Sequence, residues 1–512
     1  MTKATTNFMQ LEKQNLPFIN PDFIELPQEA IFSLTEKVLQ FGTGVLLRGL
    51  PDYFIDQANK KNVFNGRVVV VKSTSKENSA SFSNQDGLYT TLIRGYENGK
   101  KVNRTIINSS ISRVLTANEN WNEILLVASN PDLKVIISNT TEIGICLLRE
   151  SIFLNPPISF PAKLLSVLWE RYKYFGADDD KGMVIIPTEL IPENGKLLKS
   201  ILNELAIYNQ LHLDFIKWMN EENDFCNSLV DRIVPGKLSA EKKIVEESLI
   251  GYQDDLMILC EPYSLWAIES ANKKTIKTLS FAITNPTVKV VPDINLYKEL
   301  KLRLLNGTHS FSCGLAILCG FDTVKDAMQA DYFRQFVKTL MLEEIKPLLI
   351  SESISEQTAQ IFAEQVIDRF SNESIEHKWI NISMQYSTKM AIRNVPLFLL
   401  NSKKNREIPT CMILGFAAFL LFMKTEKNKD GLYQKFIGNQ FHPVNDDKAE
   451  LIYHYWLEKN TFDAVSTILS DVSIWGTNLN DIKGFCDKLV EMIESLNRGV
   501  EKNVKLLMEK KS

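Results

Sequence analysis

Cysteine and histidine are scarce in this sequence of 512 residues, which contains seven cysteines and five histidines. The cysteines are odd in number and scattered, and none of their spacings matches a zinc knuckle. We therefore expect reduced, mostly buried thiols in a cytosolic protein, with no disulfide framework and no metal site. The seven positions are Cys146, Cys226, Cys260, Cys313, Cys319, Cys411 and Cys486.

Charge of one sign is not concentrated anywhere along the chain. There are 58 lysines and arginines against 62 aspartates and glutamates, for a net charge of −4, and no block of like charges. Proteins that bind nucleic acid or anionic membranes usually carry a basic patch. The balance therefore argues against nucleic acid and against a membrane surface as the main partner.

Long hydrophobic runs are missing as well. The strongest candidate, Cys411–Met423, has thirteen residues and is closed by Lys424 and Lys427, whereas a membrane span needs about 18 or more apolar residues. We expect this run to be a buried core helix. Residues Met1–Asn20 lack the apolar core of a signal peptide, so a cytoplasmic location is expected.

The length exceeds what one ordinary hydrophobic core supports, so two large domains are expected. In about the first half, apolar strands alternate with helices, which predicts an α/β domain with a Rossmann-type, doubly wound sheet. Segments of helical periodicity dominate from about residue 195, and we expect almost everything after Pro292 to be helical. The predicted domains are residues 1–288 and a mostly α-helical domain at 289–512. The expected strands include Gly66–Val71, Thr90–Ile93, Leu125–Ala128, Val135–Ser138 and Leu279–Ile283.

A glycine turn follows the first predicted strand. Gly42 and Gly44 flank Thr43 and precede an amphipathic helix. One glycine permits a tight turn, and the other lets backbone N–H groups approach a pyrophosphate at the helix N-terminus. The third glycine of the dinucleotide fingerprint is replaced by Leu47, so the pattern is incomplete. Its position between two apolar strands still favours nucleotide binding.

The second strand ends without the acidic residue that usually binds the adenosine ribose. Lys72, Ser73 and Thr74 stand there instead, with Lys76 close by. Either hydroxyls such as those of Ser73 and Thr74 bind the ribose, or a lysine accepts a 2′-phosphate, which would favour NADP. We favour NAD(H) and leave NADP(H) open.

A third polar segment follows the strand Val135–Ser138. It contains Asn139, Thr140 and Glu142, at the carboxyl end of a parallel strand, where ligands bind in this architecture. The alternative is that Thr140 or its neighbour Thr141 caps a following helix. The residues alone do not decide between the two interpretations.

The stretch from Tyr297 to Ser310 is predicted to be a helix with a leucine stripe. It carries Lys301, Asn306 and His309. At 100° per residue, Asn306 lies about 140° and His309 about 80° around the axis from Lys301, so all three share one broad face. A proton donor, an amide and an imidazole suit the reduction of a carbonyl group. The alternative is that they are solvated or structural.

Three basic residues follow downstream. Lys389 and Arg393 are spaced i and i+4 on one predicted helix face, and His377 precedes them. They can form a clamp for a substrate carboxylate, for which an arginine is well suited. The alternative is a solvated basic edge.

Several stretches together resemble the mannitol dehydrogenase family of long-chain polyol and sugar-acid dehydrogenases. The resemblance covers most of the chain, and lysine, asparagine at +5 and histidine at +8 are its most specific mark. Within the family, other stretches resemble the branch that reduces D-tagaturonate to D-altronate. The family stretches are Phe41–Gly44 with Arg48, Ser138–Gly144, Phe160–Leu164, Asn227–Ile233 and Lys301–His309, and the branch stretches are Asp52–Asp56, Pro187–Ile191 and Glu261–Glu269.

The resemblance implies a Rossmann-type domain, a helical domain, an active site in the cleft between them, and no metal. Lys301 would be the general acid/base, Asn306 and Asn194 would hydrogen-bond the substrate oxygen, and His309 would orient a hydroxyl. Some relatives carry a glutamate where this chain has Lys298. We further expect the cofactor to contact Phe41, Gly42, Thr43, Gly44, Arg48, Ser73, Thr74, Asn139, Thr140 and Glu142, and the substrate to contact Asp231, His377, Lys389 and Arg393.

The implied reaction is hydride transfer between a nicotinamide cofactor and a small keto sugar acid in hexuronate breakdown. Fructuronate/mannonate or a mannitol-type polyol are the alternative substrates. A third possibility is a catalytically silent relative that binds nucleotide. The sequence leaves the oligomeric state open.

Overall fold

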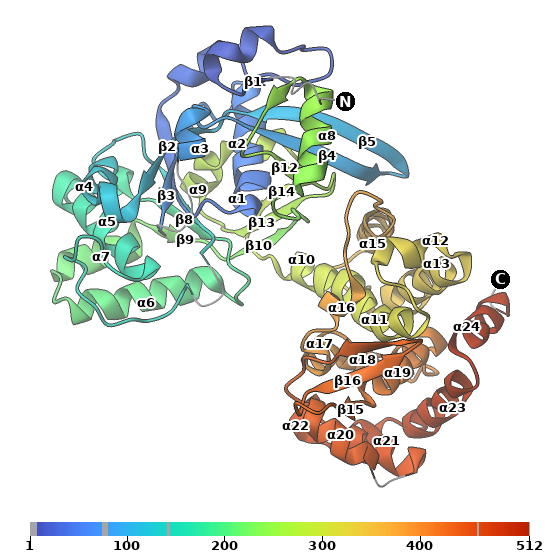
Figure 1. Ribbon diagram of the computed structural model, residues 1–512. Coiled ribbons are helices and arrows are strands. Elements are labelled where there is room, and N and C mark those ends of the chain that lie inside the picture. The colour runs from blue at the N-terminus through green and yellow to red at the C-terminus, as the bar shows by residue number, and fades with distance from the viewer. Residues whose placement is uncertain (1–7, 74–79, 141–143, 458–459, 511–512) are drawn as a thin grey trace. The chain divides into compact units, whose positions relative to one another are not determined.

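The computed structural model describes residues 8–73, 80–140, 144–457 and 460–510. The chain divides into two compact units (Figure 1). The first comprises residues 1–94 and 101–294, and the second comprises residues 95–100 and 295–512.

The described residues up to Ile294 form a mixture of strands and helices. In chain order these are β1 (Met9–Gln10), η1 (Lys13–Phe18), η2 (Glu29–Ser33), β2 (Glu36–Phe41), α1 (Val45–Gly49), α2 (Pro51–Lys60), β3 (Arg67–Lys72), α3 (Ala80–Asn84), β4 (Tyr89–Glu97), β5 (Lys100–Asn108), β6 (Ile111–Thr116), α4 (Ala117–Val127), β7 (Val135–Ser138), α5 (Phe160–Phe175), η3 (Asp179–Lys181), β8 (Val184–Pro187), α6 (Asn194–Tyr208), α7 (Leu213–Glu221), β9 (Asp224–Phe225), β10 (Ser228–Asp231), α8 (Ala240–Ile250), β11 (Tyr252–Gln253), β12 (Ile258–Cys260), β13 (Leu265–Glu269), α9 (Lys273–Thr278), η4 (Ser280–Thr284) and β14 (Val288–Val291).

The main sheet of the first unit is six-stranded and parallel, in the order β6-β3-β2-β7-β8-β9. Numbered along the chain within this sheet, that order is 3-2-1-4-5-6, the doubly wound arrangement of dinucleotide-binding domains. In the register, Gln40 lies opposite Val70 on one side and Ile137 on the other. The predicted Rossmann-type sheet is therefore confirmed.

Both faces of this sheet are covered by helices, and alternate residues of a strand point to opposite faces. Leu39 and Phe41 of β2 join the core formed with α4, α5, α6 and α7. Val38 of the same strand joins the opposite core, formed with α2. Because β3 is buried on both sides, it is an unbroken run of β-branched residues between its ends.

Three strand predictions were wrong or incomplete. Leu125–Ala128 was predicted as a strand but lies at the end of helix α4, where Ile124 and Val127 face the core and Leu126 is 69% exposed. In an apolar run this short, a buried strand and a helix segment give the same sequence pattern. Leu279–Ile283 overlaps the 3-10 helix η4. Thr90–Ile93 is a strand, but it belongs to the separate sheet β12-β4-β5.

The second unit is mostly helical, as predicted. Its elements are α10 (Asn295–Leu300), the π-helix η5 (Lys301–Gly307), α11 (Thr308–Leu318), α12 (Val324–Gln329), α13 (Asp331–Lys338), the π-helix η6 (Thr339–Ile345), α14 (Lys346–Leu349), α15 (Glu356–Phe370), α16 (Trp379–Ile382), α17 (Tyr386–Arg393), α18 (Val395–Lys403), α19 (Thr410–Met423), β15 (Glu426–Lys427), β16 (Tyr433–Ile437), β17 (Gln440–Pro443), α20 (Ala449–Leu457), α21 (Thr461–Ser470), α22 (Val472–Trp475), η7 (Leu479–Asp481), α23 (Phe485–Asn497) and α24 (Val500–Glu509).

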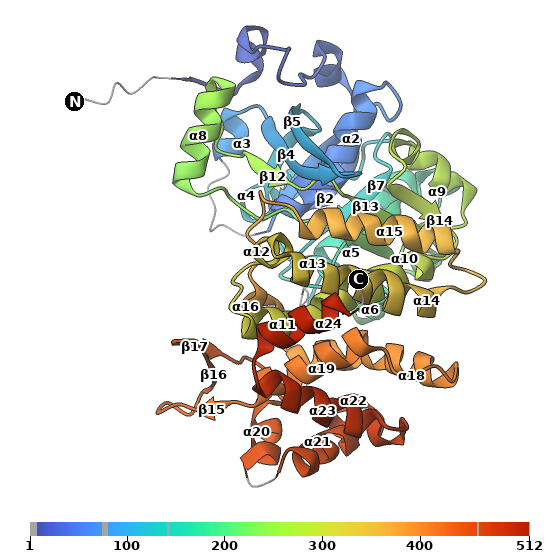
Figure 2. The same cartoon turned by 90° about the vertical axis from the view of Figure 1, so that its right-hand side faces the viewer.

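Helix α19 lies at the centre of this unit. All of Cys411–Met423 is buried, which confirms the predicted core helix. Gly415 of α19 lets the helix approach α11 closely, since a Cβ there would lie 2.6 Å from the carbonyl oxygen of Phe311. The short antiparallel sheet β15-β16-β17, shown in Figure 2, was not expected from the sequence.

Two further expectations concern the cysteines and the membrane. All seven cysteines are free, and four of them are buried. Among the described residues, no helix combines the length and the apolar character needed to cross a membrane.

Candidate active site

The glycine turn lies where strand β2 ends beside β7, at the point where the strand order of the sheet reverses. Gly42 has φ +124°, a conformation that only glycine adopts readily, and its N–H donates to the carbonyl of Val71 at 3.0 Å. A Cβ at Gly42 would lie 2.8 Å from the carbonyl oxygen of Asn139. Gly44 precedes helix α1, is exposed, and has open space where a Cβ would be. The local geometry suits the approach of a pyrophosphate.

Two other predicted cofactor residues are buried near this turn. The ring of Phe41 packs edge-on against Phe160, with centroids 5.1 Å apart. Arg48 is 5% exposed, and its guanidinium donates to the carbonyl oxygen of Leu256. Burial lowers the pKa of Arg48 below its ordinary value. In this structure Arg48 therefore stabilises the interior of the first unit, and its role toward the cofactor stays a prediction.

The polar segment after β7 is organised by a buried carboxylate that the sequence reasoning missed. Glu189 is 3% exposed, and its Oε1 accepts hydrogen bonds from the backbone N–H and the hydroxyl of Thr140, at 2.9 and 3.1 Å. Its Oε2 accepts one from Ser138 at 3.1 Å. Glu189 follows strand β8 just as Thr140 follows β7, so the same signal, a polar residue after a buried strand, was available in the sequence.

Among the described residues, the first helix after Thr140 is α5, which begins at Phe160 and is capped by Ser159. The described residues therefore show no helix that Thr140 caps, and Thr141 lies outside them. Asn139 donates to the carbonyl and the hydroxyl of Thr188, at 3.1 and 3.0 Å, which links the ends of β7 and β8.

The segment that ends strand β3 is only partly described. Ser73 is exposed directly after β3, and Lys72 is only 4% exposed. Thr74, Lys76 and Glu142 lie outside the described residues.

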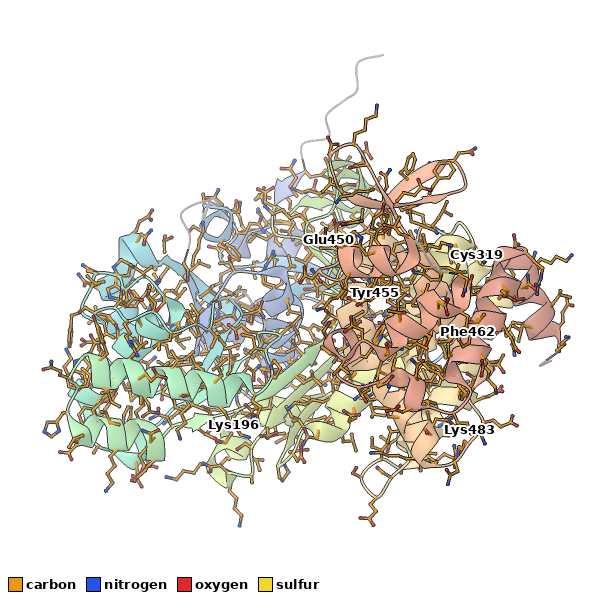
Figure 3. All side chains as sticks on the ribbon, turned by 90° about the horizontal axis from the view of Figure 1, so that it is seen from below. Lys196, Cys319, Glu450, Tyr455, Phe462 and Lys483 are labelled. Atoms are coloured by element: carbon orange, nitrogen blue, oxygen red, sulfur yellow. The ribbon has the colours of Figure 1, made fainter. Side chains whose placement is uncertain are left out.

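Asn194 is buried at the start of helix α6, two residues before Lys196, which is labelled in Figure 3. Its side-chain amide donates to the carbonyls of Pro187, Glu189 and Ser228 at 3.0 to 3.1 Å. Its Oδ1 accepts from the N–H groups of Gly195 and Ser228. The amide therefore holds two loops together, and its predicted contact with substrate stays a prediction.

Asp231 is the last residue of strand β10 and is 7% exposed. It pairs in register with Leu265 of the antiparallel neighbour β13. Its assignment to substrate binding also stays a prediction.

The predicted catalytic helix is helical throughout, but its residues are spaced around the helix axis differently from those of an α-helix. Residues Lys301–Gly307 form a π-helix between α10 and α11. A π-helix turns through fewer degrees per residue than the 100° of an α-helix, because its hydrogen bonds join residues i and i+5. Lys301 and Asn306, five residues apart, are therefore closer around the axis than the 140° derived for an α-helix. The two side chains therefore lie nearer to the same face of the helix than the sequence analysis predicted.

The π-helix is fixed to helix α17 by hydrogen bonds. Arg303 donates to the carbonyls of Ile392 and Arg393, at 2.6 and 3.0 Å. Asn394 donates to the carbonyl of Gly307 at 2.9 Å. Glu299 forms an ion pair with Arg303 at 3.1 Å, so its carboxylate supports this anchor.

His309 is buried among aromatic rings in the first turn of α11. It stacks on Phe370 with a centroid distance of 4.1 Å and an interplanar angle of 15°. The rings of His377 and Trp379 stand almost perpendicular to it, with centroids at 5.2 and 6.1 Å. The Nε2 of His309 is buried and has no hydrogen-bond partner, which is unusual for a native polar atom.

Burial and neighbouring basic residues both act on the pKa of this imidazole. Burial is the main cause that lowers the pKa of His309 well below its ordinary value, and His377, Arg369, Arg393 and Lys389 lower it further. The pKa of His377 is lowered in the same way, by burial and then by Arg369 and Lys389. Burial therefore favours the uncharged form of both imidazoles.

The two predicted clamp residues lie in this cluster. Arg393 donates to the hydroxyl of Ser310 at 3.2 Å, and burial lowers its pKa to about 10. Lys389 donates to the carbonyl of Ile382 at 2.8 Å, and burial and Arg393 lower its pKa. Both residues are half-buried, which disfavours the solvated-edge alternative. Arg369, which is 7% exposed, was missed because nothing in the local sequence relates it to His309.

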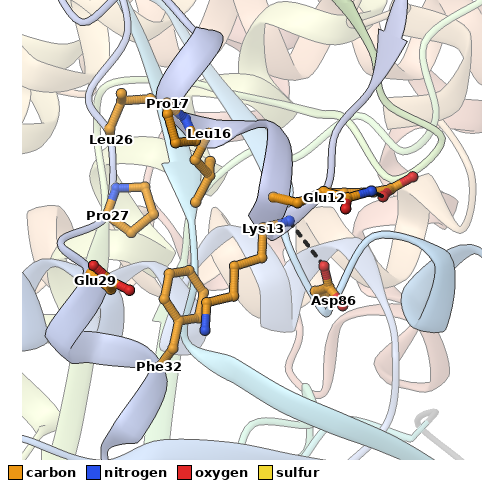
Figure 4. A pocket seen from close by; sticks show the side chains of 10 residues that line it. Glu12, Lys13, Leu16, Pro17, Leu26, Pro27, Glu29, Phe32 and Asp86 are labelled. Atoms are coloured by element: carbon orange, nitrogen blue, oxygen red, sulfur yellow. Dashed lines mark hydrogen bonds between the residues drawn. The ribbon is translucent and has the colours of Figure 1, made fainter.

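A separate cavity of about 820 Å³ lies in the first unit between η1 and η2 (Figure 4). The ammonium of Lys13 stands 4.6 Å above the ring of Phe32 there, and the backbone N–H of Lys13 donates to Asp86 at 2.9 Å. None of the predicted site residues lines this cavity.

Both units match one known family. Residues 36–280 match the mannitol dehydrogenase Rossmann domain, and residues 293–497 match the mannitol dehydrogenase C-terminal domain. The chain belongs to the mannitol dehydrogenase family. The resemblance noted in the sequence is thereby confirmed.

Relatives in the mannitol dehydrogenase family are similar to the chain over most of its length. It is 36% identical to the altronate oxidoreductase of Halalkalibacterium halodurans over 485 residues, covering 92% of each chain. It is 34% identical to the altronate oxidoreductase of Bacillus subtilis over 468 residues, covering 90% of this chain and 93% of the relative.

Solved structures share the fold. The mannitol 2-dehydrogenase of Pseudomonas fluorescens, solved with NAD and D-mannitol, superposes with a TM-score of 0.68 at 21% identity, covering 98% of this chain and 100% of the other. A substrate-free D-sorbitol dehydrogenase superposes with a TM-score of 0.78 at 18% identity, covering 97% and 99%.

Proposed function

We propose that this protein is an NAD(H)-dependent reductase of a keto sugar acid, converting D-tagaturonate to D-altronate. The observation that carries the proposal is the similarity to altronate oxidoreductases, at 31–36% identity over 90% or more of the chain. The cationic cluster around His309 supports it independently, because a carboxylate needs such partners and a neutral polyol does not.

The nicotinamide nucleotide fits the first unit. Gly42 and Gly44 would let its pyrophosphate approach the backbone, and Asn139 and Thr140 lie at the reversal of the strand order where such ligands bind. When bound, it supplies the hydride for the carbonyl carbon.

The residues of the second unit would perform the proton chemistry. Lys301 gives a proton to the carbonyl oxygen during reduction and takes it back in the reverse reaction. Asn306 donates a hydrogen bond to the same oxygen and stabilises its developing negative charge. The uncharged His309 uses Nε2 either to accept a hydrogen bond from a neighbouring hydroxyl or to donate one to it.

Lys389 and Arg393 would hold the substrate carboxylate, and replacement of Arg393 tests this. Arg393→Ala should raise KM for tagaturonate by at least about 30-fold, because truncating one partner of a desolvated charge pair is costly. KM for fructose, which lacks the carboxylate, should change little. The measurement is steady-state kinetics with both substrates.

The control for this variant is Arg406→Ala, which removes an exposed arginine from the loop after α18. It should leave both KM values near those of the unmodified enzyme. An equal rise in KM for tagaturonate and for fructose in Arg393→Ala would contradict the carboxylate clamp.

Cofactor preference is part of the proposal, with NAD(H) favoured. Lys72, the last residue of β3, is almost completely buried, which makes it a poor binding partner for a 2′-phosphate. Turnover should therefore be faster with NADH than with NADPH at equal concentration. A preference for NADPH would overturn this part.

A substrate panel tests the reaction itself. Loss of NADH absorbance should be fastest with tagaturonate, slower with fructuronate and slowest with fructose. Faster turnover of fructuronate or fructose would instead indicate a fructuronate reductase or a mannitol-type dehydrogenase. NADH binding without oxidation by any of the three would indicate a catalytically silent relative.

A further inference from the structure

Glu189 follows strand β8, and its buried carboxylate reaches the segment at the end of β7. Its Oε1 accepts hydrogen bonds from the backbone N–H and the hydroxyl of Thr140, at 2.9 and 3.1 Å. Its Oε2 accepts one from the hydroxyl of Ser138 at 3.1 Å. Both oxygens of one carboxylate therefore hold the same short segment, residues 138–140.

Glu189 is also bonded to Asn194, through its main chain. The carbonyl oxygen of Glu189 accepts a hydrogen bond from the side-chain amide of Asn194 at 3.1 Å. The preceding residue, Thr188, ties the two strand ends together, because its N–H and its hydroxyl donate to the carbonyl of Ser138 at 2.8 and 2.7 Å. Glu189 is thus hydrogen-bonded both to a predicted cofactor segment and to a predicted substrate residue.

Strands β7 and β8 belong to the second half of the main sheet. The strand order reverses between β2 and β7, with β6, β3 and β2 on one side and β7, β8 and β9 on the other. In this architecture each half binds one nucleotide of a dinucleotide, and the first half binds the adenosine. The ends of β7 and β8 therefore lie on the side of the nicotinamide.

We propose that Glu189 is a positioning residue for hydride transfer, which holds residues 138–140 in place for the nicotinamide half of the cofactor and fixes their position relative to Asn194. The proposal rests on the proposed function for the cofactor and the reaction. It goes beyond that function because it gives a role to a residue outside the predicted site and joins the cofactor segment to the substrate amide.

The reason for such a link is geometric. Reacting atoms must approach within about 3 to 3.5 Å, and a displacement of about 1 Å can cost 100-fold in rate. One residue that is hydrogen-bonded to both segments limits their relative displacement. A carboxylate suits this position because it offers only acceptors, and the N–H and the two hydroxyls that it meets can all donate.

The competing explanation is that Glu189 only satisfies buried donors and so stabilises the sheet. Its loss would then lower the melting temperature and weaken every nucleotide ligand alike. ADP separates the two explanations, because it carries the adenosine and the pyrophosphate of NADH but no nicotinamide.

The test is Glu189→Ala, with Glu189→Gln as the conservative variant. Glu189→Ala should lower the affinity for NADH about tenfold and kcat for tagaturonate about 10- to 100-fold, while the affinity for ADP stays unchanged. Glu189→Gln should restore most of both losses, because its amide oxygen still accepts from Thr140 and the hydroxyl of Ser138 can accept from its amide N–H. Calorimetric titration with NADH and with ADP, together with steady-state kinetics, measures these quantities.

The matched control is Glu204→Gln, at an exposed glutamate of helix α6, which should behave like the unmodified protein. Equal losses of NADH and ADP affinity in Glu189→Ala, or no loss of either, would overturn the proposal.

If Glu189→Ala does not fold, Ser138→Ala takes its place, because it removes only the hydrogen bond to Oε2. It should lower the affinity for NADH about fivefold, the loss of one hydrogen bond, with ADP affinity unchanged. An unchanged NADH affinity in this variant would overturn the proposal. An unmodified protein that binds NADH but reduces no keto acid would instead overturn the proposed function, while the titrations would still test Glu189.

Discussion

Replacing Lys301 by alanine is expected to lower kcat for tagaturonate by about 10²- to 10⁴-fold, the range that a positioned general acid contributes. The reason is that the oxygen of the reduced carbonyl must receive a proton as its negative charge develops. The affinity for NADH should stay unchanged, because Lys301 belongs to the second unit and the glycine turn belongs to the first. Steady-state kinetics and fluorescence titration with NADH measure the two quantities.

Lys403→Ala is the control, since it removes an exposed lysine from the end of helix α18. It should retain full activity. Near-normal kcat in Lys301→Ala would exclude this lysine as the acid/base. A parallel loss of NADH binding would indicate a structural defect, which the melting temperature would reveal.

Replacing the two glycines of the nucleotide turn should separate stability from binding. Gly42→Ala should lower the free energy of unfolding by on the order of 1–3 kcal/mol, because φ +124° is strained for alanine. Its Cβ would also meet the carbonyl of Asn139 at 2.8 Å and the side chain of Leu47 at 2.9 Å. Thermal unfolding measures the loss.

Gly44→Ala is the matched partner. Gly44 has φ −59° and ψ 154°, which any residue adopts, and a Cβ there meets nothing within 4 Å. Stability should change by less than about 0.5 kcal/mol. The affinity for NADH should still fall by about tenfold or more, because the methyl group would occupy the space through which a pyrophosphate reaches the backbone. Unchanged NADH affinity in Gly44→Ala would show that the pyrophosphate does not bind at this turn.

The nucleotide side of the site could be anticipated because its signals are local. The β-branched run before Lys72 predicts a strand buried on both faces, and the glycines after Phe41 predict a tight turn. Glu189 was missed although the same rule applies to it. Its partner Thr140 lies 49 residues away in the sequence, and only the parallel pairing of β7 with β8 brings them together.

The catalytic side was predicted less completely, because its geometry depends on tertiary contacts. Leucine periodicity identifies a helix around Lys301, but a π-helix differs from an α-helix by hydrogen bonds that leave no simple pattern in the sequence. The contacts of Arg303 with the carbonyls of Ile392 and Arg393 anchor this segment. Arg369 escaped attention for the same reason, since Phe370 and His309 meet only in the folded chain.

The central claim is hydride transfer to the carbonyl carbon of a keto sugar acid. The most direct measurement uses NADH deuterated at C4, prepared separately with each of the two stereochemistries, and D-tagaturonate. The account predicts altronate that carries one deuterium on the former carbonyl carbon, from one of the two cofactor forms. NADH oxidation without deuterium in the product from either form, or the absence of altronate, would contradict it.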